Sequence, residues 1–336
     1  MTLRAATWLA GALAVAATLI VPTALTGTAW LPALSRFPFN GTLAIGAVIL
    51  GSWLAKGIKF RLLTAALGQS TGLATCVAVS LGCDLGFAAT PGGVGGYPAT
   101  IFLFDRVGVA PVCAAAIAAA DQALDLVFFL VAVPLASLWL AAHGVSVWIR
   151  VSVSASLLLL AAVTLCALVL WRITRLRPGV LISVLARLPL LLRRRVLLAR
   201  WWIELRAHLR TLRTASPLVL CTSLMMTVIQ WVLRFAALGV ALAWLGHPAP
   251  PIAVFLFQAV ALHAGQWTGV PGGVGGADLI LAKTLGGWSP VASLATALLI
   301  WRLATFHLTL LGGGVAFAAL SARRSSTRTL LADAGT

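Results

Sequence analysis

The stretch Pro91-Gly92-Gly93-Val94-Gly95-Gly96 decides the fold, because the same six residues recur unchanged at 271–276. Each copy interrupts a long apolar run and is followed by a short apolar piece that could form half a helix. Within hydrocarbon, a broken backbone is tolerated only where protein or a water-filled cavity surrounds it. Two breaks at corresponding positions of two halves therefore predict a binding site near the middle of a membrane. The alternative is a pair of ordinary glycine-rich loops at the membrane surface.

The composition indicates a polytopic membrane protein. The chain is 61% hydrophobic and 9% charged, whereas a soluble globular domain is about half apolar and about one quarter charged. We therefore expect residues 1–336 to form a single integral membrane domain. The five cysteines lie within apolar runs and form no Cys-x-x-Cys motif, so we expect no disulfide framework and no metal site. We also expect no cofactor.

The net charge of +17 comes from 24 Lys and Arg residues against 7 Asp and Glu residues. Because the Arg residues cluster beside apolar spans, positive-inside topology and contact with anionic lipid head groups explain the excess. We therefore expect anionic membrane lipids as partners and no nucleic acid.

Eight apolar segments can be marked along the chain. They cover about 5–25, 42–55, 66–90, 108–142, 149–171, 216–245, 252–270 and 289–319. Most approach the roughly 20 residues that a spanning helix needs. The first segment lacks a clean cleavage site, so we interpret it as an uncleaved span rather than a signal peptide.

The distribution of positive charge predicts the topology. Three basic clusters can be marked. Lys56, Lys59 and Arg61 follow the second segment, and eleven Arg residues lie in Arg172–Arg213, before the sixth segment. Arg323, Arg324 and Arg328 follow the last segment. All three should be cytoplasmic. If every segment crossed completely, the eleven-Arg block would lie outside. Re-entrant hairpins at the two glycine breaks, entering from opposite faces, place it inside. The predicted fold is therefore an all-α membrane helix bundle with two inverted halves and cytoplasmic termini.

This topology divides the chain into five regions. They are the first span and outer loop at 1–41, the first half at 42–171, a basic cytoplasmic segment at 172–213, the second half at 214–320 and a cytoplasmic tail at 321–336. The basic segment mixes Leu, Trp201, Trp202 and Arg, which favours a helix lying at the membrane interface. A solvated linker is the alternative for this segment.

Acidic residues gather around the two breaks. Five of the seven acids of the chain are found there, namely Asp84, Asp105, Asp121, Asp125 and Asp278. An ionisable side chain at the bilayer centre costs at least about 2.5 kcal/mol, so such residues are functional candidates. Asp105 stands next to Arg106 and is expected to form a local ion pair.

Asp121 and Asp125 share one helical face at i and i+4. Two ionised carboxylates at this spacing repel, so one should be protonated or a cation should lie between them. We expect Asp84, Asp121 and Asp125 to carry charge or relay protons, although pairing with Arg or a polar cavity lining would also fit.

Two arginines, Arg234 and Arg302, lie well inside apolar segments. Each could meet a buried acid or hold a phosphate, for which the planar guanidinium is well shaped. The breaks themselves offer backbone N–H groups and helix N-termini that suit an anion. The candidate substrate-binding residues are Gly92, Gly93, Gly95, Gly96, Gly272, Gly273, Gly275, Gly276, Asp278, Arg234 and Arg302.

The sequence contains no Ser-His-Asp order, no His/Cys metal cluster and no acyltransferase-sized soluble domain, which favours a transporter over an enzyme. His263, Gln266 and Trp267 precede the second break, and His307 lies in the last segment. We interpret the histidines as hydrogen-bonded packing residues.

The second break, followed by Asp278 and later by Trp301-Arg302-Leu303, resembles the flippase-like transmembrane family that includes the membrane region of bacterial lysylphosphatidylglycerol synthases. The first half resembles the same family through its Pro-Gly break and Asp121-x-x-x-Asp125. The likeness covers roughly residues 40–320. The family usually has Glu after the second break, and an acid where Tyr97-Pro98 stands after the first. Because the aminoacyl-transferring domain is absent, the resemblance implies lipid translocation or a related carrier role.

We therefore expect a flippase-like transporter that moves an anionic or modified lipid, of the phospholipid or polyprenyl-phosphate type, across a bacterial cytoplasmic membrane. One alternative is a non-catalytic scaffold for an envelope lipid or glycan enzyme, and another is an intramembrane lipid-modifying enzyme. A homo-oligomer and an envelope enzyme partner are both left open.

Overall fold

The computed structural model describes residues 16, 18–143, 195–266 and 268–322. Within these ranges every regular element is a helix, which confirms the all-α prediction. The predicted span at 149–171 and most of the tail lie outside the described residues, as does the larger part of the predicted first span.

The first half begins after a short helix, α2 (Trp30–Ser35), and runs in chain order through α3 (Phe39–Ala66), α4 (Leu73–Ala89), the 3-10 turn η1 (Pro91–Gly93), α5 (Gly96–Arg106) and α6 (Pro111–Ala142). The second half follows α9 (Arg195–Arg213) and comprises α10 (Pro217–Trp244), α11 (Pro251–Gln266), the 3-10 turn η3 (Pro271–Gly273), α12 (Gly276–Leu285), α13 (Val291–Arg302), the π-helical turn η4 (Leu303–His307) and α14 (Leu308–Ser321).

Four helices among the described residues are long and apolar enough to cross a membrane. They are α3, α6, α10 and the continuous helix Val291–Ser321, whereas the apolar helices α4 and α11 are shorter. The bundle is therefore polytopic, as its composition predicts. One boundary differs from the prediction, because α3 continues to Ala66 instead of ending at residue 55.

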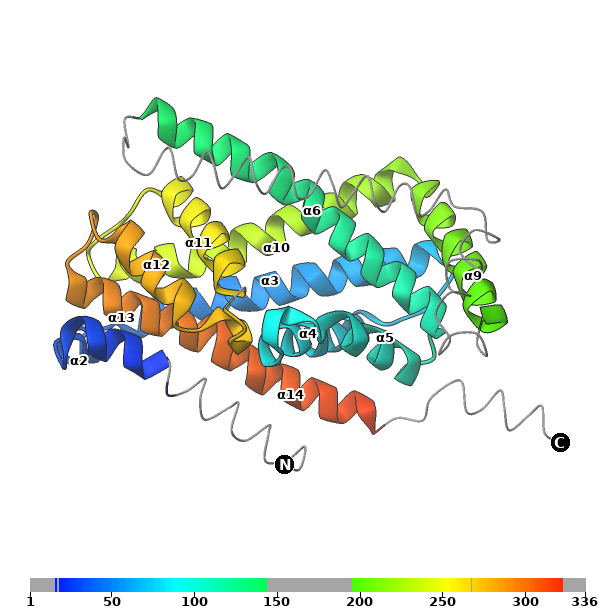
Figure 1. Ribbon diagram of the computed structural model, residues 1–336, viewed down its shortest axis with the longest axis horizontal. Coiled ribbons are helices and arrows are strands. Elements are labelled where there is room, and N and C mark those ends of the chain that lie inside the picture. The colour runs from blue at the N-terminus through cyan, green and yellow to red at the C-terminus, as the bar shows by residue number, and fades with distance from the viewer. Residues whose placement is uncertain (1–15, 17, 144–194, 267, 323–336) are drawn as a thin grey trace.

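Both glycine breaks turn the chain back on itself. Helix α4 packs against α5, and α11 packs against α12, so each break is the tip of a helical hairpin. The hairpins point toward each other from opposite ends of the long axis (Figure 1). A Cβ on Gly86 would lie 2.5 Å from the carbonyl oxygen of Gly95, and one on Gly265 would lie 3.0 Å from that of Gly273. Glycine is thus required where each hairpin closes.

The two halves are inverted relative to each other. Helices α3 and α10 pack along much of their lengths, and they run antiparallel, since Gly41 lies against Trp244 while Gly51 lies against Leu233. The long helix of each half covers the hairpin of the other, because α14 packs on α4 and α6 packs on α11. This exchange places both tips in the interior.

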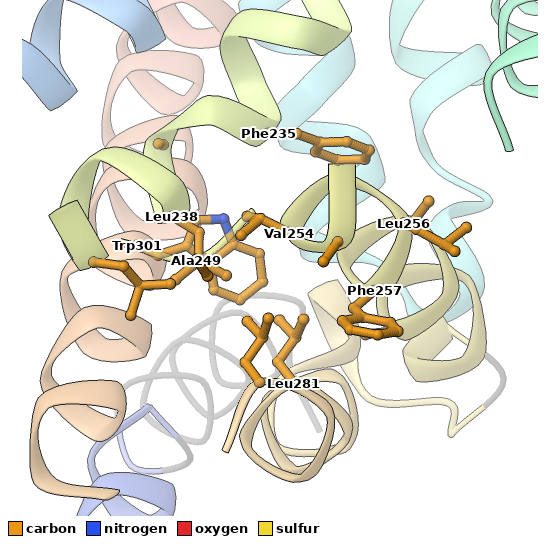
Figure 2. Packing of buried hydrophobic residues seen from close by; sticks show 14 of the residues in the cluster. Phe235, Leu238, Ala249, Val254, Leu256, Phe257, Leu281 and Trp301 are labelled. Atoms are coloured by element: carbon orange, nitrogen blue, oxygen red, sulfur yellow. The ribbon is translucent and has the colours of Figure 1, made fainter. Parts of the chain in front are cut away.

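Two apolar cores hold the hairpins in place. The larger core joins the halves through side chains such as Phe235, Leu238, Phe257, Leu281 and Trp301 (Figure 2). The second core surrounds the first hairpin and extends to Leu205 and Leu212 of α9. The described part of the predicted basic segment is therefore helical, and it packs against α6 at the opposite end of the bundle from α2 (Figure 1).

Candidate functional site

The two glycine breaks meet in the interior, where η1 packs against η3. Both begin with the same backbone conformation, since Gly92 has φ 63° and ψ 8° and Gly272 has φ 64° and ψ 8°. The following residues, Gly93 and Gly273, also have positive φ. Two successive left-handed residues reverse the chain direction without the steric cost that a side chain would add.

The identical sequences then diverge at the valine. Val94 continues in a helical conformation and is 69% exposed, whereas Val274 is extended, 2% exposed and packed against Phe306. The next residue also differs between the two breaks, because Gly275 has φ 87° while Gly95 has φ −78°. The different surroundings of the two tips, rather than their sequence, therefore select these conformations.

A buried ion pair holds the second break. Arg302 Nε donates to Asp278 Oδ1 at 2.7 Å, and the two Nη atoms donate to the carbonyl oxygens of Gly272 at 3.0 Å and Gly273 at 3.3 Å. Asp278 Oδ2 in turn accepts the N–H of Gly275 at 2.7 Å. Arg302 and Asp278 thus tie α13 to both arms of the break, and much of the hydrogen-bonding capacity of the guanidinium is used inside the protein. A phosphate-binding role for Arg302 stays a prediction.

Neutral groups hold the first break. Thr90 Oγ1 accepts the N–H of Gly95 at 2.8 Å and donates to the carbonyl oxygen of Gly86 at 2.7 Å. The Tyr97 hydroxyl donates to Gln122 Oε1, which links α5 to α6. In the first half, the neutral pair Tyr97–Gln122 therefore joins the hairpin to the long helix. In the second half, the ion pair Asp278–Arg302 makes the corresponding connection.

The backbone N–H groups of the breaks are less available than the sequence suggests. Gly93 donates to the carbonyl oxygen of Thr90, and Gly273 donates to that of Val270. The N–H groups of Gly95 and Gly275 are bound by Thr90 and Asp278, as described above. At these four glycines the expected free N–H group is absent, because each closes a turn of the break itself.

Three charged side chains from three helices form a buried triad. Lys56 Nζ of α3 lies 2.5 Å from Asp84 Oδ1 of α4, and Arg234 Nη1 of α10 lies 2.6 Å from Asp84 Oδ2. The side chains of Lys56 and Asp84 are each 5% exposed, whereas that of Arg234 keeps 21% of its surface open. One carboxylate is thus held between two cations, which leaves the triad with a net positive charge.

A second charged cluster lies between α3 and α6. Lys59 Nζ lies 2.6 Å from Asp121 Oδ1 and 2.9 Å from Asp125 Oδ1, and it donates a hydrogen bond to Asp125. The Lys59 side chain is fully buried. A cation therefore lies between the two carboxylates, which is one of the two arrangements that their i, i+4 spacing allows.

Lys56 and Lys59 correct the sequence-based interpretation, which placed them in a cytoplasmic basic cluster. Both are buried inside α3 and paired with acids from other helices. The positive-inside pattern counts charges along the chain and does not include partners that tertiary folding supplies. The sequence feature that could have predicted this burial is Phe60–Ala66, a stretch rich in apolar residues that lets the helix continue past the lysines.

A cavity of about 570 Å³ lies where the breaks and the triad come together. Its charged lining residues are Lys56, Asp84, Asp125, Arg234 and Arg302, and its Phe, Tyr and Trp residues are Phe87, Tyr97, Phe129, Trp231, Phe235, Trp301 and Phe306. Gly92, Gly93 and Gly272 also line it, and the exposed Val94 stands at its wall. An amphiphilic space of this size suits a polar head group flanked by apolar chains.

Two polar atoms in the cavity wall have no partner within the described structure. Gln230 Oε1 and Trp231 Nε1 are buried without a hydrogen bond, and both residues line the cavity beside Arg234. Buried polar groups are normally satisfied. The α10 wall therefore contains one unsatisfied acceptor and one unsatisfied donor, close in sequence to the cation Arg234.

The remaining candidates fall into two groups. His263 and Gln266 line the cavity, and His263 Nδ1 bonds the carbonyl oxygen of Ala259 at 2.7 Å. His307 bonds the Thr18 hydroxyl at 3.0 Å, outside the cavity lining. Trp267 lies outside the described residues. No group of three or more His, Cys, Asp or Glu side chains able to hold a metal occurs in the described part of the chain.

The sequence was compared with models of known protein families. The family described as the lysylphosphatidylglycerol synthase TM region matches residues 7–313. The chain belongs to this family. Membership in the lysylphosphatidylglycerol synthase TM family confirms the predicted resemblance and connects the protein with membrane lipids. A comparison with curated proteins found no match.

Proposed function

We propose that this protein is a flippase-like transporter that moves an anionic lipid between the two leaflets of a membrane. The observation that carries the proposal is the amphiphilic cavity at the meeting point of two opposed hairpins. A lipid has to pass a charged head group through the hydrocarbon region, so a polar cavity at that depth meets the main energetic demand of translocation.

Arg234 is the head-group ligand that we favour. Among the described residues its side chain is the most exposed of the ion-paired cations, and there its Nη1 alone has a hydrogen-bond partner, Asp84. Trp231, one turn earlier on α10, has a buried Nε1–H donor that has no partner among the described residues. Guanidinium binds phosphate through paired N–H groups, so a phosphate lying against α10 would be held by both residues while the acyl chains extend into the bilayer.

Anionic lipid is favoured over neutral lipid by the net charge of the triad. Lys56 and Arg234 share one carboxylate, that of Asp84, so the triad itself carries one excess positive charge that attracts an anion. The family also connects the protein with lipids. The proposal extends to a bacterial cytoplasmic membrane with both termini in the cytoplasm, as positive-inside topology predicts.

Reconstituted liposomes provide the test. Fluorescent phosphatidylglycerol would be followed from the inner to the outer leaflet by chemical quenching. We expect Arg234→Gln to slow translocation by about tenfold or more, because a charged hydrogen bond is worth about 1.5–3 kcal/mol. Arg61→Gln is the matched control, since Arg61 is exposed and lies outside the cavity.

The scaffold alternative makes the opposite prediction. If the folded wild-type protein, reconstituted alone, moves no phosphatidylglycerol and no polyprenyl phosphate, the transport proposal is wrong and a role as partner of an envelope enzyme gains support. Equal rates for wild type and Arg234→Gln would instead reject the proposed head-group site. Recovery of a lipid of changed mass would point to a lipid-modifying enzyme.

A further inference from the structure

The buried charges of the described residues balance overall but are distributed unevenly. Five ion pairs join eight side chains, which are Lys56, Lys59, Arg234 and Arg302 on the basic side and Asp84, Asp121, Asp125 and Asp278 on the acidic side. The Arg302 pair is neutral. The triad around Asp84 carries one excess positive charge, and the cluster around Lys59 carries one excess negative charge. Without a ligand the site is therefore electroneutral.

An anionic head group would upset this balance. A phosphate diester beside Arg234 neutralises the excess charge of the triad and leaves the negative charge of the Asp121–Asp125 cluster uncompensated. Uncompensated charge is strongly disfavoured away from water. A carboxylate near a second carboxylate responds to this situation by taking up a proton.

We propose that the Asp121–Asp125 pair binds one proton with each anionic lipid head group that enters the cavity, so that lipid translocation is coupled to proton movement. The inference rests on the proposed transport function and adds its coupling ion. A proton from the water on one side forms an O–H bond on a carboxylate oxygen. When the lipid leaves, that bond breaks and the proton returns to water on the side where the lipid is released.

Asp125 is the point of proton entry. Of the two carboxylates it is the one that lines the cavity, and its side chain is 12% exposed compared with 6% for Asp121. Lys59 contacts both carboxylates from the buried side, at 2.6 and 2.9 Å. The proton then belongs to the pair rather than to one residue, because two acids that share the cation Lys59 titrate as a coupled pair.

Several other ionisable groups face this region. They are Lys56 and Lys59 of α3, Cys83 and Asp84 of α4, Tyr97 of α5, Arg234 of α10, His263 of α11 and Arg302 of α13. Asp84 already has two cationic partners, so it needs no proton. His263 is the serious competitor, since it lines the cavity and its Nδ1 is held by the Ala259 carbonyl oxygen.

Proton uptake on lipid binding tests the proposal directly. The purified full-length protein, in weakly buffered detergent with a pH indicator, would be titrated with short-chain phosphatidylglycerol. We expect about one proton taken up for each lipid bound, and an apparent affinity that falls by up to about tenfold per unit rise in pH. Short-chain phosphatidylcholine, which has no net charge, should bind without proton uptake.

Variants identify the side chains that bind the proton. Asp121→Asn, a change outside the cavity lining, should still bind phosphatidylglycerol but take up no proton, because Lys59 and Asp125 then form a neutral pair. Asp125→Asn should also take up no proton, which provides a second variant if the first does not fold. Asp105→Asn is the matched control, since Asp105 lies outside the cavity, and it should keep the uptake of the wild type.

The outcomes separate this inference from the proposed function. Binding of phosphatidylglycerol by the wild type without proton uptake overturns the coupling and leaves lipid transport intact. Uptake that persists in Asp125→Asn but disappears in His263→Gln overturns the assignment to the carboxylate pair. A folded wild type that binds no phosphatidylglycerol rejects the proposed lipid site itself, and the coupling with it.

Discussion

Single residues decide how each break is built. Gly92 and Gly272 have the same left-handed conformation, yet their surroundings differ. A Cβ on Gly92 would meet nothing within 4 Å, whereas one on Gly272 would lie 2.2 Å from the Phe306 ring. The same residue type is therefore needed for backbone conformation at one tip, and for both conformation and space at the other.

These surroundings predict unequal costs for alanine. Gly92→Ala should destabilise the protein by about 1–2 kcal/mol, the cost of a left-handed alanine. Gly272→Ala should cost about 1–3 kcal/mol more, because overpacking adds to the strain. Thermal unfolding of the two variants in detergent would measure the difference.

The overpacking contribution to the cost of Gly272→Ala can be measured separately. In a double-mutant cycle, Phe306→Ala should recover part of the loss caused by Gly272→Ala and none of that caused by Gly92→Ala. Equal unfolding temperatures for the two alanine variants would contradict the described packing of the second tip.

At the scale of elements, small residues let the hairpins approach the spanning helices. A Cβ on Gly57 of α3 would lie 2.3 Å from Val77 Cγ2 and 3.0 Å from Val77 Cα of α4. Gly46, on the same helix, has open space around it. Helix association in membranes depends on such close packing, since lipid and protein interiors are equally apolar. The contact between α3 and α4 also places Lys56 beside Asp84.

Gly57→Ala should therefore separate α3 from α4. We expect a loss of about 1–3 kcal/mol in stability from overpacking, together with reduced lipid translocation as the triad is displaced. Gly46→Ala is the matched control and should be neutral or slightly stabilising, because alanine is the better helix former. Thermal unfolding and the liposome assay would report the two effects, and similar behaviour of both variants would contradict the close α3–α4 contact.

At the scale of the whole molecule, the inverted arrangement gives the two hairpins opposite outer ends. Ser70 lies between α3 and α4, at the outer end of the first hairpin, and Gly287 lies between α12 and α13, at the outer end of the second. Both residues are exposed. The hairpins point inward from opposite ends of the bundle (Figure 1), so we expect these two positions to lie on opposite sides of the membrane.

Single cysteines would test this topology. In a background with the five native cysteines replaced, Gly287→Cys in intact cells should react with a membrane-impermeant maleimide. Ser70→Cys should react only after the membrane is opened, because Arg61 near it favours the cytoplasmic side. Labelling of both positions in intact cells would rule out the inverted arrangement.

Much of the architecture could be predicted because it depends on local pattern. The apolar runs marked at 108–142, 216–245 and 289–319 predicted the helices α6, α10 and Val291–Ser321 within a few residues of their observed bounds. The combination Pro-Gly-Gly interrupts the helix at both places where it occurs in the described residues, so both breaks were visible in the sequence. The Asp121–Asp125 spacing also predicted that a cation or a proton must lie between the two carboxylates.

The sequence predicted a binding site at the two breaks, but not how the charges around it pair, because they come from helices far apart in the chain. Lys56 meets Asp84 across a helix contact, and Arg234 joins them from the other half. An apolar helix with two lysines at its end resembles a membrane boundary when its partners are unknown. Only their burial beside acids shows that α3 continues through that point.

The sequence by itself determined that this chain is a membrane helix bundle with two matching breaks, since composition and glycine content act locally and without reference to partners. Tertiary structure alone decided which charges face each other and what each break becomes. Val94 and Val274 stand in identical hexapeptides, but one is exposed and the other is packed against Phe306. The reason is physical: a flexible glycine segment has several conformations of similar energy, and the contacts around it select one.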